Sequence, residues 1–120
     1  METTFKYDII GFSDDLGLPL EDIANLYSEF LKEIKSEVCK LKILFNEKDW
    51  NSIKIILHNI KGISANYRII DVYEETAKIH NAIKICDYDN IEPLFNGLLI
   101  IFENAIKEIS KYFEQKGFPV

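Results

Sequence analysis

Apolar residues recur at three- and four-residue steps along most of this chain, and this spacing is typical of one face of an α-helix. The first such segment runs from Leu20 to about Asn46, and Glu and Lys residues fill many of the positions between the apolar ones. Its expected inner face consists of Ile23, Leu26, Tyr27, Phe30, Ile34, Val38, Leu41 and Phe45. The pattern predicts one long amphipathic helix here.

Three more helices follow the first. The second begins near Asp49, a residue type that caps helix N-termini, and its inner stripe consists of Trp50, Ile53, Leu57, Ile60, Ser64 and Tyr67. The third follows a short break at residues 66–70, and its inner face consists of Val72, Tyr73, Thr76, Ile79 and Ile83. The fourth opens around Asp89 and Asn90 with Pro93 in its first turn, and its inner face consists of Leu94, Leu98, Ile101, Phe102, Ala105, Ile109 and Tyr112.

The residues before Gly17 are expected to form a short extra helix that caps one end of the molecule, with Phe5, Ile9, Ile10, Phe12 and Leu16 as its apolar residues. No segment alternates with the period of a strand, so the predicted fold class is all-α. Short connections leave consecutive helices as neighbours, which favours an antiparallel up-down-up-down four-helix bundle. We expect one domain over residues 1–120, with a capping segment at 1–19 and the bundle at 20–116.

Composition narrows the class of function. A hydrophobic share of 48% supplies a core, and a net charge of −6 repels nucleic acid, so no nucleic-acid partner is expected. The longest apolar run, Leu98 to Phe102, is far too short for a membrane span. Cys39 and Cys86 are isolated and follow no secretory segment, so we expect reduced thiols, which pack rather than react, in a cytoplasmic protein.

The sequence lacks the motifs of several kinds of catalytic site. Two histidines without a Cys/His cluster make a zinc site improbable, so no metal is expected. No Gly-rich phosphate loop is present, so any kinase activity resides in another protein.

The most informative stretch lies in the second helix around His58. At about 100° per residue, His58 falls outside the apolar stripe and faces outward, on the same side as Lys54, Lys61, Gly62 and Ala65. A glycine inside a helix costs about 1 kcal/mol relative to alanine, so helix formation does not explain Gly62.

This combination predicts a particular chemistry. Gly62 and Ala65 form a smooth patch that lets another protein surface approach the ring, and Lys61 can neutralise an anion on it. A neutral imidazole is a nucleophile near pH 7, and its phosphoramidate passes the phosphoryl group onward. The stretch therefore favours a site that carries a phosphoryl group on His58.

The pattern His58-x-x-Lys61-Gly62, set mid-helix and followed by small residues and an acid-rich third helix, resembles the histidine-containing phosphotransfer (HPt) domain of two-component signalling. The helix order and the turn at residues 86–89 extend the resemblance from Leu20 to about Phe113. The resemblance implies that His58 is phosphorylated, that Lys61 lies beside the phosphate, and that Gly62 leaves room for the partner. It also implies a monomer without a cofactor, whose partners are a histidine kinase and a response-regulator receiver domain that supplies its own Mg²⁺.

Two positions depart from the family pattern. Arg68 stands where the family usually has glycine, and it is expected either to hinder close docking or to form a salt bridge with an acidic receiver. His80 stands where the family tends to have Gln or Glu that bonds the ring. A hairpin centred near Ile69 brings residues 58 and 80 level, so His80 either contacts the His58 ring and fixes its tautomer or is a core-edge histidine with another partner.

Two further alternatives stay open from the sequence. Lys54, one turn before His58, either steers an acidic partner or is simply solvated. The whole domain is either a phosphotransfer protein or a non-catalytic interaction bundle, in which the surface around Gly62 and Ala65 docks a partner without chemistry.

Overall fold

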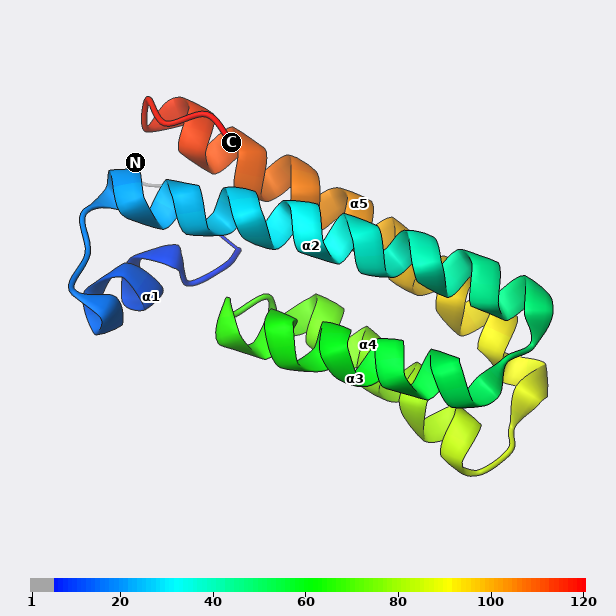
Figure 1. The fold of residues 1–120 in the computed structure, drawn as a ribbon. Coiled ribbons are helices and arrows are strands. Elements are labelled where there is room, and N and C mark those ends of the chain that lie inside the picture. The colour runs from blue at the N-terminus through cyan, green and yellow to red at the C-terminus, as the bar shows by residue number, and fades with distance from the viewer. Residues whose placement is uncertain (1–5) are drawn as a thin grey trace.

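The structure is a computed structural model that describes residues 6–120, and every regular element in this range is helical. Figure 1 shows the order of the elements along the chain. They are α1 (Ile9–Leu16), α2 (Leu20–Glu47), α3 (Trp50–Asn66), α4 (Ile70–Lys84), the 3-10 turn η1 (Tyr88–Asn90) and α5 (Ile91–Gln115). The predicted all-α class is confirmed for the described residues.

The predicted helix boundaries agree closely with the structure because local signals set them. Asp49 caps α3, since its carboxylate accepts a hydrogen bond from the backbone N–H of Ser52 at 3.2 Å. Pro93 lies in the first turn of α5, where its missing N–H needs no partner within the helix. The break between α3 and α4 covers only residues 67–69, within the range that the sequence predicts.

The four long helices enclose one core. α2 packs against α3, α3 against α4, α4 against α5, and α5 returns to α2. In Figure 1, α3 and α4 lie together on one side of the molecule, below α2 and α5. The largest side chains that are almost fully buried come from all of these helices, and they include Tyr27, Phe30, Ile34, Leu41, Ile53, Leu57, Ile60, Ile79 and Phe113.

Most of the predicted inner positions are buried, but Tyr73 is not. Its side chain is 37% exposed, whereas its neighbour Val72 is 1% exposed. The buried stripe of α4 follows Val72, Thr76, Ile79 and Ile83, and Tyr73 lies about 100° around the helix from Val72. The prediction of Tyr73 as an inner residue is therefore wrong. Cys39 and Cys86 are also exposed free thiols, so the expectation that they pack is wrong.

The predicted N-terminal helix is present as α1, and it lies beside α2 and the turn between α3 and α4. Ile9 is buried, and the ring of Phe12 lies 5.4 Å from that of Tyr27 and 5.3 Å from that of Tyr67. Other residues expected on this helix do not pack, since Ile10 and Leu16 are 63% and 47% exposed. Phe5 lies outside the described residues.

Candidate functional site

The position of His58 follows from the residues that α3 buries. Leu57, Ile60 and Ser64 are fully buried and fix the inner face of the helix. His58 comes one residue after Leu57, so it is rotated out of the core, and its side chain is exposed. The prediction that this imidazole faces outward is confirmed.

Gly62 lies one turn after His58, on the same exposed face of α3. A Cβ atom placed on Gly62 meets no heavy atom within 4 Å, so no internal packing requires a glycine there. Ala65 is also exposed. The backbone of this stretch of α3 is therefore open to a surface that approaches from outside.

His80 on α4 lies next to Lys61 on α3. The Nδ1 atom of His80 is 3.4 Å from Nζ of Lys61. Because an ammonium only donates, Nδ1 accepts this hydrogen bond from Lys61, and the His80 ring is in its neutral form. Burial lowers the pKa of His80 below its ordinary value, and the positive charges of Lys61 and Lys84 lower it further. These surroundings therefore favour the neutral form of the His80 ring.

The sequence suggests a contact between His80 and the His58 ring, but in the structure the hydrogen bond of His80 goes to another residue. The hydrogen bond of His80 goes to Lys61, one turn after His58, while His58 acts on the His80 ring through its charge. The two histidines are therefore close enough to interact electrostatically. A direct contact that fixes the tautomer of His58 stays a prediction.

Five side chains make up what we call the α3–α4 basic patch, namely Lys54, His58, Lys61, His80 and Lys84. Lys54, His58 and Lys61 lie on successive turns of α3, His80 and Lys84 lie one turn apart on α4, and the 3.4 Å contact between Nζ of Lys61 and Nδ1 of His80 joins the two sets. The charges of the other four residues also lower the pKa of His80. A cationic surface of this kind stands out in a chain of net charge −6. The sequence reasoning missed Lys84, although its place one turn after His80 was the available signal.

Arg68 lies in the turn between α3 and α4 with a φ of +61°, in the left-handed region where glycine is favoured. Its guanidinium donates to Asp8 at 2.9 Å and also pairs with Asp15. Both terminal nitrogens of the guanidinium are therefore paired with carboxylates at α1. The side chain is engaged within the chain and does not point to an external partner.

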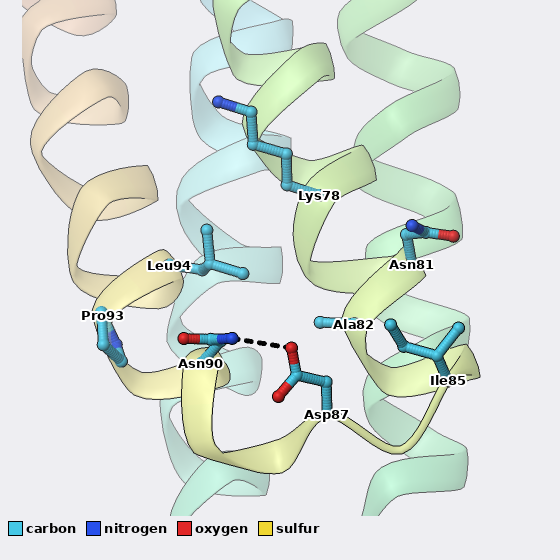
Figure 2. Close-up of a pocket in the computed structure, with 8 residues that line it drawn as sticks. All are labelled: Lys78, Asn81, Ala82, Ile85, Asp87, Asn90, Pro93 and Leu94. Atoms are coloured by element: carbon cyan, nitrogen blue, oxygen red, sulfur yellow. Dashed lines mark hydrogen bonds between the residues drawn. The ribbon is translucent and has the colours of Figure 1, made fainter.

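A surface groove lies elsewhere, where α4 meets η1 and α5 (Figure 2). Its lining residues are Lys78, Asn81, Ala82, Ile85, Asp87, Asn90, Pro93 and Leu94, and none of them belongs to α3. The amide of Asn90 donates to Asp87 at 2.7 Å, and Lys78 donates to Glu75 at 2.7 Å. The polar groups of the groove are thus partly occupied by local bonds, and none of the predicted site residues lies in it.

Two features are absent from the described residues. Within residues 6–120, no three His, Cys, Asp or Glu side chains come together as a group that could hold a metal ion. None of the helices in this range combines the length and apolar character needed to cross a bilayer.

Comparison with protein-family models, with curated protein sequences and with solved structures finds no match for this chain. The geometry around His58 is therefore the basis for assigning a function.

Proposed function

We propose that this protein is a histidine phosphotransfer protein, in which His58 accepts a phosphoryl group and exchanges it with the aspartate of a response-regulator receiver domain. The observation that carries the proposal is the exposed ring of His58 within the α3–α4 basic patch, beside the unfilled space at Gly62. The proposal includes an antiparallel up-down-up-down arrangement of the four long helices, which would present one face of α3 to the partner.

The residues of the patch have separate roles in this proposal. A neutral ring nitrogen of His58 attacks the phosphorus atom, and Lys61 and Lys54 offset the negative charge that arrives with it. Gly62 and Ala65 let the receiver approach closely. The receiver supplies Mg²⁺, and a separate histidine kinase supplies phosphate to the pathway, so this chain needs neither a nucleotide site nor a cofactor.

The compartment belongs to the proposal as well. Cys39 and Cys86 are free thiols on the surface, which fits a reducing environment. Receiver domains and the catalytic parts of histidine kinases act in the cytoplasm, and the proposal places this protein with them.

Phosphoryl transfer from a phosphorylated receiver tests the proposal. We expect an adduct on the wild-type protein that is labile in acid and stable in base, as a phosphoramidate is. His58→Gln should abolish the adduct, while His80→Gln, which removes the other histidine, should retain it. Absence of an adduct with several receivers, or its persistence in His58→Gln, would contradict the proposal.

One observation favours the second candidate, a non-catalytic interaction module. Ile55 is 62% exposed and lies one turn before His58 on α3, so the surface offers a large apolar side chain to a partner. Binding of a receiver with equal affinity to wild type and His58→Gln, without any adduct, would support this candidate instead.

A further inference from the structure

The ring of His80 is surrounded by positive charge while His58 is unmodified. Lys61 lies 3.4 Å away on α3, and Lys54 and His58 act on the ring from the same helix. Lys84 acts on it from α4 itself. α5 and η1 also pack against α4, but the largest charge effects on this ring come from residues of α3 and α4. The field at His80 is therefore set by cations from two helices.

A phosphoryl group on His58 would reverse this field. Such a group carries nearly two negative charges near pH 7, more than the charge of one neighbouring lysine. An anion within a few ångströms stabilises the charged form of an imidazole, whereas the present cations disfavour it. The same ring would then change from the neutral to the protonated form without any rearrangement of the helices.

We propose that His80 is a second phosphate-binding group of this site, which is neutral beside Lys61 while His58 is free and takes up a proton when His58 carries a phosphoryl group. This inference rests on the proposed function of His58. It assigns a role to the residue that departs from the Gln or Glu of the family pattern. It also links the phosphorylation of His58 to the pH of the solution.

Protonation of His80 would change its Nδ1 atom from the acceptor to a donor, which would break the hydrogen bond with Lys61. A protonated Nδ1 is a donor and no longer accepts a hydrogen bond from Nζ of Lys61. The ammonium of Lys61 is released from the ring and becomes free to bind the phosphoryl oxygens. Lys61 and the protonated His80 then both face the phosphoryl group.

The atoms of the step balance as follows. The P–O bond of the receiver aspartyl phosphate breaks, and its electron pair remains on the carboxylate. The lone pair of a neutral ring nitrogen of His58 forms the new P–N bond. The His58 ring keeps the proton on its other nitrogen and becomes a phosphoimidazolium. Loss of that proton to the solvent offsets the proton that His80 takes up, so the step requires no other proton source.

Nuclear magnetic resonance of imidazole-labelled protein tests the inference. The chain contains only two histidines, so the His80 signals are readily assigned by comparison with His58→Gln. Phosphoramidate serves as the phosphate donor, since it modifies histidine without a receiver. We expect phosphorylation of His58 to raise the pKa of His80 by about 1 or more, measured from about pH 5 to about pH 9. His58→Gln treated with phosphoramidate is the control and should show no change.

A second variant tests, without phosphorylation, whether negative charge at position 58 affects His80. His58→Glu places a carboxylate at an exposed position of α3, and it should raise the pKa of His80 relative to His58→Gln. If His58 is phosphorylated but the pKa of His80 does not rise, this inference is wrong while the proposed function stands. If neither phosphoramidate nor a phosphorylated receiver modifies His58, both are wrong.

Discussion

Gly62 is a residue whose own surroundings do not explain its presence. It lies in the interior of α3, where glycine is unfavourable, and the space beside it is empty. Gly97 is a useful contrast on α5, since a Cβ there would make an ordinary contact of 3.8 Å with Glu75. Both positions accept alanine sterically, but only Gly62 lies next to His58.

We predict that Gly62→Ala and Gly97→Ala each raise the free energy of unfolding by about 0.5 to 1 kcal/mol, because alanine restricts the unfolded chain. Gly62→Ala should in addition slow phosphoryl transfer from a receiver by about tenfold, the effect of roughly 1.4 kcal/mol of lost docking energy. Urea unfolding and transfer rates measure the two effects. Equal transfer rates for both variants would show that Gly62 is not part of the docking surface.

His80 gives a second prediction at the residue scale. Its pKa in the folded protein lies below the ordinary value of 6.5, so the unfolded chain binds a proton more readily. The stability that the neutral ring contributes is present above about pH 6.5 and is lost as the pH falls from there through the folded pKa. We expect His80→Gln to lose less stability than wild type between about pH 7 and pH 5, as measured by urea unfolding. Parallel curves for the two proteins would contradict this.

At the scale of elements, α1 is attached to the rest of the molecule by a small number of identified contacts. Arg68 holds it through Asp8 and Asp15, and Gly11 leaves room for this pairing, since a Cβ there would overlap Asp8 Oδ2 and Arg68 Nη1. Arg68 adopts an unfavourable left-handed backbone conformation at this position. The ion pairs and the backbone conformation therefore act in opposite directions on stability.

We predict that Arg68→Gly changes the free energy of unfolding by less than about 1 kcal/mol, because relief of backbone strain offsets the lost ion pairs. Hydrogen exchange in α1 should nevertheless become faster by about fivefold, the factor that corresponds to 1 kcal/mol of local stability. Amides in the middle of α3 serve as the internal reference. Asp15→Asn, which removes one pair and leaves the backbone of residue 68 unchanged, should accelerate α1 exchange less. Unchanged exchange in α1 for both variants would show that these pairs do not hold the helix.

The helices themselves were predictable because their signals are local. Asp49 and Pro93 are residues that start helices, and the apolar spacing from Ile23 to Leu41 identifies one face without knowledge of any partner. Tyr73 was mispredicted because a large residue next to a stripe is buried only if a neighbouring helix covers it. That information is not local.

At the scale of the whole molecule, charge is unevenly distributed. The chain carries a net charge of −6, yet the cations of the α3–α4 basic patch gather around His58 and His80. An acyl phosphate and the carboxylates around it form an anionic surface, so this patch would attract a receiver that the rest of the molecule repels.

We predict that Lys54→Glu slows transfer from a phosphorylated receiver by about threefold or more at low salt, through slower association. Lys111→Glu on α5 has the same net charge and should leave the rate nearly unchanged. Stopped-flow or quenched transfer assays at low and high ionic strength measure the effect. The difference between the two variants should shrink as salt screens the patch. Equal rates at low salt would contradict a steering role for Lys54.

By itself, the sequence determined the helices, most of their buried faces and the outward direction of His58, because each depends on periodicity within a single segment. Tertiary structure alone decided which side chains from different helices meet. It placed His80 on Lys61, added Lys84 to the basic patch, and turned Arg68 toward α1. These contacts depend on the rotation and register of one packed helix against another, which differ by whole side-chain positions for the same sequence pattern.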